Sequence, residues 1–231
     1  MKVVILCGGL GTRLSEETKK IPKPMVKIGN KPMIVHIMER YAKYNYKDFI
    51  LALGYKKNII IDYFKKNKFK DWNIKLVDTG LNSLTGTRLL KLKNHLNEEK
   101  FFFLTYGDGI SNVNLKELLE FHKKKNKVAT LTAVKPPARF GELFLKNNVV
   151  KNFEEKNQIN TGWINGGFFV FSNEIFRFIP KQCMLEREPM RKLTNKKELI
   201  AFKHSGFWQC MDTLRDKKLL CKLWKSKKNK W

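Results

Sequence analysis

The sequence predicts an α/β fold with a doubly wound, mostly parallel, Rossmann-like sheet and extra strands on its substrate side. Apolar runs of strand length alternate with longer segments of helical period, an arrangement typical of parallel sheets that carry helices on both faces. Several of these runs are continuously apolar, as expected for strands covered on both faces. A glycine-rich loop follows the first run directly, at the position where open α/β sheets bind ligands.

The expected elements are taken in chain order. Strands are expected at residues 3–6, 49–53, 74–77, 101–104 and 129–134. Helices are expected at 33–44, directly after Pro32, at 58–66, and at 115–125, with Asn114 as the N-cap. After Pro136-Pro137 the pattern changes to short strands at 142–145, 149–153, 167–171 and 199–202, and a last helix at about 213–224. No linker in this pattern divides the chain into separate domains.

Composition excludes several classes of protein. The 231 residues include 42% hydrophobic residues, which is enough for a packed core and argues against disorder. The four cysteines form no C-x-x-C pair and the four histidines lie far apart, so neither a disulfide framework nor a zinc site is indicated. No segment reads as a signal peptide or a membrane span, and we expect a cytoplasmic protein.

The chain carries 47 Lys and Arg against 21 Asp and Glu, a formal charge of +26. One interpretation is a nucleic-acid-binding surface that neutralises phosphates. However, the lysines are scattered in small groups, without a helix-turn-helix, zinc-finger or RNA-recognition pattern. We therefore favour a solvated basic surface that attracts small anions, with no specific nucleic-acid partner. The basic tail at 217–231, with Trp224 and Trp231, leaves peripheral attachment to anionic membranes open.

The loop after the first strand reads Gly8-Gly9-Leu10-Gly11-Thr12-Arg13. Its glycines leave backbone N–H groups unshielded, while Thr12 and Arg13 add a hydroxyl and a cation that suit polyphosphate. It is neither a G-x-G-x-x-G fingerprint nor a P-loop. In Pro22-Lys23-Pro24, the prolines are expected to hold Lys23 in extended backbone and to aim its ammonium group.

Two aspartates are candidate metal ligands. Asp108 lies between glycines just after an apolar strand, where an exposed carboxylate suits Mg²⁺. Asp212 precedes the last predicted helix, and from the residues alone it is either an N-cap or a ligand.

Together with Pro22-Lys23-Pro24-Met25, the glycine-rich loop resembles the opening signature of the sugar-1-phosphate nucleotidyltransferases. Further matches to that family follow in the same order along nearly the whole chain: Ser15-Glu16-Glu17-Thr18, Val77-Asp78-Thr79-Gly80, Thr105-Tyr106-Gly107-Asp108-Gly109, Arg139-Phe140-Gly141, Trp163-Ile164-Asn165-Gly166-Gly167-Phe168-Phe169, Glu186-Arg187-Glu188-Pro189, Gly206-Phe207-Trp208 and Met211-Asp212-Thr213-Leu214-Arg215-Asp216. The resemblance implies one nucleotidyltransferase domain over 1–231, with a nucleotide-binding core at 1–135 and a sugar-phosphate-binding elaboration with the C-terminal helix at 136–231.

The resemblance also implies the roles of individual residues. The catalytic set is Arg13, Lys23, Asp108 and Asp212, and the two aspartates bind Mg²⁺. Nucleotide contacts are implied for Leu6, Cys7, Gly8, Gly9, Leu10, Gly11, Thr12, Arg13, Lys23, Ser83, Arg88 and Gly107. Sugar-phosphate contacts are implied for Glu155, Lys156, Asn165 and Gly166. Asn157 replaces the proline that usually follows the Glu-Lys pair, and core packing is the simplest interpretation of Trp163 and Trp208.

The members that the chain resembles most use CTP and glucose 1-phosphate. The expected reaction is Mg²⁺-dependent cytidylyl transfer that gives CDP-glucose and pyrophosphate, by a homo-oligomer. The same chemistry with UTP, dTTP or ATP, or a non-catalytic protein that binds nucleotides or nucleic acid, are the alternatives. The connection from Phe64 to Ile74 is shorter than in those members, which leaves base recognition and oligomer assembly open.

Overall fold

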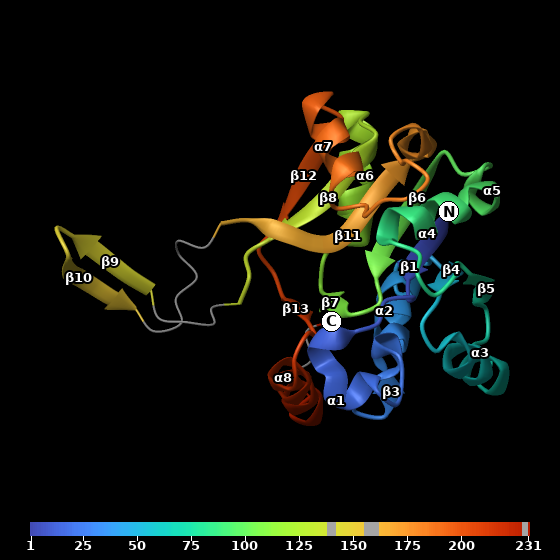
Figure 1. Cartoon of the computed structure of the whole chain (residues 1–231), viewed down its shortest axis with the longest axis horizontal. Coiled ribbons are helices and arrows are strands. Elements are labelled where there is room, and N and C mark those ends of the chain that lie inside the picture. Colours follow the sequence, from blue (N-terminus) through green and yellow to red (C-terminus); the bar gives the residue numbers. More distant parts are fainter. Residues whose placement is uncertain (138–141, 155–161, 228–230) are drawn as a thin grey trace.

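The computed structural model describes residues 1–137, 142–154, 162–227 and 231, and its centre is a seven-stranded sheet (Figure 1). In spatial order the strands are β12 (Leu199–His204), β8 (Ala129–Val134), β11 (Ile164–Ser172), β6 (Phe101–Tyr106), β1 (Lys2–Leu6), β4 (Asp48–Leu53) and β5 (Asn73–Asp78). β11 runs antiparallel to both of its neighbours, and the other pairs are parallel. The predicted mostly parallel α/β sheet is therefore confirmed.

Helices cover both faces of this sheet because its strands are apolar on both sides. In β1, Val3 and Ile5 belong to one core, while Val4 and Leu6 belong to the other. The first core is closed by α2 (Met33–Ala42), α3 (Lys57–Lys66), α6 (Leu115–Lys125) and α8 (Leu214–Lys225). The second is closed by α4 (Thr85–Lys91), α5 (Lys93–Leu96) and α7 (Glu188–Asn195). Two separate cores are what a doubly wound sheet requires.

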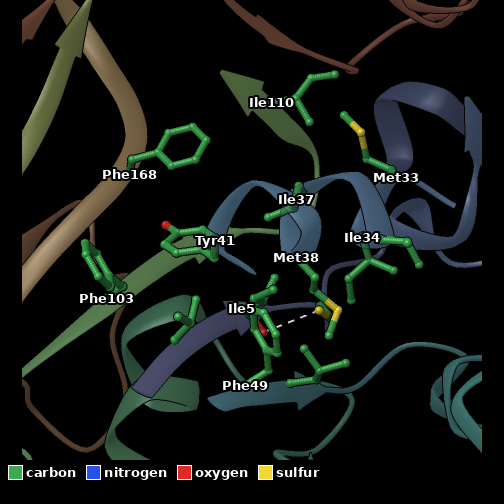
Figure 2. Packing of buried hydrophobic residues seen from close by; sticks show 14 of the residues in the cluster. Ile5, Met33, Ile34, Ile37, Met38, Tyr41, Phe49, Phe103, Ile110 and Phe168 are labelled. Atoms are coloured by element: carbon green, nitrogen blue, oxygen red, sulfur yellow. Dashed lines mark hydrogen bonds between the residues drawn. The ribbon is translucent and has the colours of Figure 1, made fainter. Parts of the chain in front are cut away.

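The first core is built around α2, which packs its apolar face across the centre of the sheet. Figure 2 shows Ile34, Ile37, Met38 and Tyr41 of α2 among Ile5, Phe49, Phe103 and Phe168 from the strands. The Tyr41 ring meets the Phe103 ring edge to face, with centroids 5.3 Å apart. Burial of such large side chains contributes roughly 1.5–3 kcal/mol each, so this contact fixes α2 and the segment before it on the sheet.

The elements predicted from apolar runs are present within a few residues of the expected bounds. The match is complete for β8 and α6, and the Asn114 side chain caps α6 by accepting from the backbone N–H groups of Lys116 and Glu117. The strands expected at 167–171 and 199–202 are β11 and β12, which lie inside the central sheet. The short strands β7 (Gly109–Ser111) and β13 (Trp208–Cys210) were not predicted.

Smaller pieces complete the fold. A hairpin of β9 (Glu142–Lys146) and β10 (Val149–Glu154) extends away from the sheet (Figure 1). Near the start of the chain lie three single turns, η1 (Thr12–Leu14), α1 (Ser15–Thr18) and η2 (Lys23–Met25), and the strand pair β2 (Lys27–Ile28) and β3 (Lys31–Pro32). A further turn, η3 (Asn173–Arg177), follows β11.

The tryptophans of the basic tail pack against the body of the protein. The rings of Trp224 and Trp231 both meet His36 of α2, with centroids 4.9 and 6.0 Å away, and Trp231 stacks on Phe207 at 5.5 Å. These contacts hold α8 against α2, and the structure therefore gives both rings a packing role. In the part of the chain that the structure describes, no helix has the length and apolar character needed to span a bilayer.

Candidate active site

Two aspartates from distant parts of the chain meet beside the carboxyl ends of β1 and β6. Asp108 directly precedes β7, and Asp212 follows β13 by two residues. β7 and β13 pair antiparallel, and the Met211 N–H donates to the Asp108 carbonyl over 2.8 Å. This small sheet therefore sets the spacing of the two carboxylates.

The ammonium group of Lys23 lies between these carboxylates. Its Nζ donates to Asp108 Oδ2 and to Asp212 Oδ1, each over 2.6 Å, and the Lys23 side chain is 9% exposed. Burial alone would lower the pKa of Lys23, but the two carboxylates outweigh burial and raise it. For Asp212, burial acts to raise the pKa, and the hydrogen bond and charge of Lys23 reverse this, so that its pKa lies below the usual range. Lys23 and Asp212 are therefore both ionised near neutral pH.

Two more groups contact Asp212. Arg13 Nη1 donates to Asp212 Oδ2 over 2.6 Å from a side chain that is 72% exposed. The Cys210 thiol is 3.6 Å from the same oxygen, and burial followed by the nearby carboxylates raises the pKa of Cys210 to about 12. Cys210 is therefore a neutral thiol. Arg13 is the solvent-exposed cation of this cluster.

The chain around Lys23 folds to bring its side chain inward. Pro22 has extended backbone, and Lys23 is the first residue of the turn η2, with Pro24 in its first-turn position. The expectation that Pro24 keeps Lys23 in extended backbone is therefore wrong, because a single 3-10 turn accepts proline in its first positions.

At two positions near Lys23 the backbone packs so closely against neighbouring residues that only glycine fits. A Cβ on Gly11, whose φ is +68°, would lie 2.8 Å from Thr18 Cγ2 and 3.2 Å from Lys23 Cβ. A Cβ on Gly107 would lie 2.8 Å from Pro24 Cγ. Side chains at either position would push the Lys23 segment away from Asp108.

A cavity of about 350 Å³ opens on one side of the cluster. Its lining includes these residues predicted to contact the nucleotide: Leu6, Cys7, Gly8, Gly9, Gly11, Thr12, Arg13, Lys23, Ser83, Arg88 and Gly107. Leu10 is the exception, since its side chain is 53% exposed and is not part of the lining. Burial raises the pKa of the Cys7 thiol, so this residue is a neutral part of the wall.

Arg88 shapes this cavity from within the protein. The residue is 3% exposed, and its guanidinium makes five hydrogen bonds of 2.7–3.0 Å. The acceptors are the carbonyls of Gly8, Leu53, Gly80 and Leu81 and the Thr79 hydroxyl. A Cβ on Gly8 would lie 2.1 Å from Arg88 Nη1. Arg88 therefore ties the glycine-rich loop to the chain after β5.

A second cavity of about 390 Å³ lies on the other side of Asp108 and Asp212. Asn165 and Gly166 line it, as predicted for the sugar-phosphate side, and the Trp208 indole donates to the Gly166 carbonyl over 2.7 Å. The two cavities share Arg13, Thr85, Tyr106, Asp108 and Met184 in their walls. Two ligands bound side by side would meet at Asp108.

The second cavity is also lined by Glu186, a carboxylate to which the sequence analysis assigned no role. Glu186 accepts from the Tyr106 hydroxyl over 2.5 Å and from the Thr85 hydroxyl over 2.6 Å. Burial, and then the charge of Glu186, raise the pKa of Tyr106 well above its usual value, so the phenol stays protonated and donates. Glu186 and Tyr106 are part of family motifs in the sequence, but their hydrogen bond joins residues far apart in the chain.

Three further predictions concern the Glu155-Lys156 pair, the packing of Trp163 and the capping role of Asp212. Glu155 and Lys156 lie outside the described residues. Trp163 is 41% exposed, with Lys135 and Lys203 over its ring at 6.0 and 5.5 Å, so core packing is wrong for it. Asp212 does not cap the last helix, because Thr213 is the N-cap of α8 and shares a capping box with Asp216.

The donor set fits a divalent cation that retains open positions. Carboxylate oxygens of Asp108 and Asp212 converge on one positive group, the ammonium of Lys23. No cluster of three or more His, Cys, Asp or Glu occurs within residues 1–137, 142–154 and 162–227 that could enclose a metal. Two carboxylates with free positions for phosphate and water are the ligand pattern that suits Mg²⁺.

The model of one protein family, described as nucleotidyl transferase, matches residues 2–212. The chain belongs to this nucleotidyl transferase family. The match extends from β1, which carries the glycine-rich loop, to Asp212. The predicted family membership and enzyme class are thus confirmed.

Relatives within the family are similar over full length. The chain is 44% identical to glucose-1-phosphate cytidylyltransferase of Salmonella typhimurium, and the alignment covers all of this chain and 98% of that protein. It is 39% identical to a probable glucose-1-phosphate cytidylyltransferase of Bacillus subtilis, over all of this chain and 99% of that protein.

Solved structures support the fold. HddC from Yersinia pseudotuberculosis, complexed with GMP-PN, has a TM-score of 0.77 at 27% identity, with 96% of this chain and 99% of that chain covered. A UDP-glucose pyrophosphorylase complexed with UDP-glucose has a TM-score of 0.73 at 20% identity, with 98% of each chain covered, and it supports the fold alone.

Replacement of Arg88 by lysine should destabilise the protein although the charge is kept. Lysine has three donors on one nitrogen and cannot reach the five acceptors of the guanidinium fork. The unpaired carbonyls should lower the free energy of unfolding by about 1–3 kcal/mol, measured by urea denaturation. Arg191→Lys, at an exposed position on α7, is the matched control and should change it by less than about 0.5 kcal/mol. Equal effects of the two substitutions would contradict the bracing role of Arg88.

Proposed function

We propose that this protein transfers a cytidylyl group from CTP to α-D-glucose 1-phosphate and releases CDP-glucose and pyrophosphate. The observation that carries the proposal is the junction of two cavities at Asp108, where Lys23, Arg13 and Asp212 gather. The full-length similarity to a protein named glucose-1-phosphate cytidylyltransferase supports the choice of both substrates.

The reaction is an in-line displacement at phosphorus. A phosphate oxygen of glucose 1-phosphate forms a bond to the α-phosphorus of CTP, and the bond from that phosphorus to the oxygen bridging to the β-phosphate breaks. The electron pair leaves with pyrophosphate. The nucleophile is already an anion, so no general base is required, and catalysis consists of positioning and charge stabilisation.

The roles of the basic residues follow from their exposure. Arg13 is mostly exposed at the mouth of both cavities, and we assign it to the triphosphate and the leaving pyrophosphate. Lys23 is buried in the wall of the first cavity and donates to Asp108, where the two cavities meet, and we assign it to the phosphates at the reacting centre. Asp108 and Asp212 keep Lys23 charged, because their carboxylates raise its pKa.

We assign Mg²⁺ to Asp108 and Asp212. When bound there, the ion would neutralise phosphate oxygens of the reacting groups. The four cysteines are free thiols, which fits the reducing cytoplasm that we propose as the location. Assembly as a homo-oligomer remains a prediction.

For glucose 1-phosphate, we assign the second cavity. Asn165, Gly166 and Glu186 line it, and a carboxylate is a strong acceptor for sugar hydroxyls. The contacts predicted for Glu155 and Lys156 remain expectations from the sequence.

Purified protein should release pyrophosphate from CTP when Mg²⁺ and glucose 1-phosphate are present. A panel of CTP, UTP, dTTP, ATP and GTP, each with glucose 1-phosphate, should give the highest kcat/KM for CTP. GTP is included because HddC binds GMP-PN.

Lys23→Gln should lower kcat with CTP by about 100-fold or more, because one well-placed charge stabiliser is lost.

Each result of the panel has a separate meaning. Preference for another nucleotide would remove the cytidylyl assignment and leave the chemistry in place. An absence of turnover with all five nucleotides, together with tight salt-dependent binding of polynucleotide, would instead support the non-catalytic alternative.

Glu186→Gln should weaken recognition of the sugar more than that of the nucleotide. The amide keeps the shape of the side chain but loses the charge that strengthens hydrogen bonds from sugar hydroxyls. We expect KM for glucose 1-phosphate to rise about tenfold or more, which corresponds to roughly 1.4 kcal/mol. KM for CTP should change less than twofold, as it should for both substrates in the exposed control Glu174→Gln, on η3. Equal changes in both KM values would exclude a role specific to the sugar.

A further inference from the structure

A large cavity lies at the edge of the sheet opposite the active site. Its volume is about 840 Å³, and Phe101, the first residue of β6, and Val128, just before β8, are in its wall. Asp108 follows the other end of β6, so the six residues of that strand separate the two sites, a distance of roughly 20 Å at about 3.3 Å per residue. Residues of α7 and η3 complete the wall of the cavity at the amino ends of these strands. It shares no residue with either active-site cavity.

Basic side chains from separate parts of the chain converge on this cavity, which we name the basic pocket. They are Lys100 before β6, Lys127 before β8, Arg177 in η3, and Lys192 and Lys196 at the end of α7. Two acidic residues, Glu174 and Glu198, share the wall. Five positive and two negative charges leave a local excess of three positive charges.

The acidic groups near the basic pocket are already engaged. Glu198 pairs with Lys127 over 3.1 Å and also accepts from the Val128 N–H over 3.1 Å. Glu174 pairs with Arg177 over 3.7 Å. Outside the pocket wall, Glu188 pairs with Lys192 over 2.8 Å.

Lys100 and Lys196 differ from the three cations that are paired with glutamates. Among the residues that the structure describes, no ion pair is found for either lysine. Each ammonium instead lies over an aromatic ring, Lys100 over Phe101 at 5.4 Å and Lys196 over Phe178 at 5.7 Å. Such contacts hold a lysine in place without neutralising it. These two charges are therefore available to an anion.

We propose that the basic pocket binds a small molecule that carries phosphate. Its negative charge would meet the charges of Lys100 and Lys196, and the volume lies within the range of small-molecule sites. Arg177 offers a fork suited to phosphate oxygens, and the lysines offer point charges. The rings of Phe101 and Phe178 provide apolar surface for the rest of the ligand.

The separation of the sites means that this ligand would bind while substrates occupy the active site. A polynucleotide fits the same observations less well, because these charges line a single cavity. The proposal does not depend on which nucleotide the active site uses.

Lysine footprinting tests the site directly on the full-length protein. Brief acylation, followed by mass spectrometry of peptides, reports the rate at each lysine with and without inorganic pyrophosphate at matched ionic strength. At ten times the dissociation constant, acylation of Lys100 and Lys196 should slow about tenfold. Lys65 and Lys68, which line a separate cavity beside Phe69 and Trp72, are internal controls and should change less than twofold.

A pair of matched variants links the protection to the pocket. In Lys100→Gln/Lys196→Gln, pyrophosphate should no longer protect Lys192, whereas in Lys65→Gln/Lys68→Gln that protection should persist. Equal slowing at all lysines would indicate general screening and would overturn the proposal, as would unchanged rates at Lys100 and Lys196. Protection of these two lysines by single-stranded DNA but not by pyrophosphate would replace the small ligand with a nucleic acid. No readout involves activity, so failure here leaves the proposed reaction untouched.

Discussion

The two hydrogen bonds from Lys23 to Asp108 and Asp212 are the contact on which the site depends. One buried ammonium compensates two carboxylates that would otherwise repel each other in a region largely removed from water. The pairing of β7 with β13 brings the aspartates together, and the bare surfaces of Gly11 and Gly107 let the Lys23 segment approach. Local folding at three distant places thus converges on one charge arrangement.

Much of the fold could be predicted because its signals are local. Continuous apolar runs predict β1, β4 and β6, since both faces of the sheet are covered. Helical periodicity and the Asn114 cap predict α6 within its observed bounds. The strands β7 and β13 were missed because three residues carry too little pattern. Their pairing is nevertheless what positions Asp108 beside Asp212.

The candidate site could be predicted in part, because family motifs identify residues but not their contacts. The glycine-rich loop, Lys23, Asp108 and Asp212 do meet in the structure. Arg88 lines the first cavity as predicted, but the sequence does not show that its guanidinium also donates to four backbone carbonyls and the Thr79 hydroxyl. The contact of Glu186 with Tyr106 depends on how α7 and β6 are placed by packing, which no local motif encodes. The +26 charge likewise gave no position for the basic pocket.

Lys23 sets the charge state of Asp212, and a measured pKa of that carboxyl group shows whether it does. Carbon-13 NMR of the labelled carboxyl group, followed as a function of pH in the metal-free protein, gives this pKa. It should lie below the ordinary aspartate value, and Lys23→Gln should raise it by about one pH unit or more, since the adjacent opposite charge is lost. An Asp212 pKa that is unchanged in the variant would contradict the account.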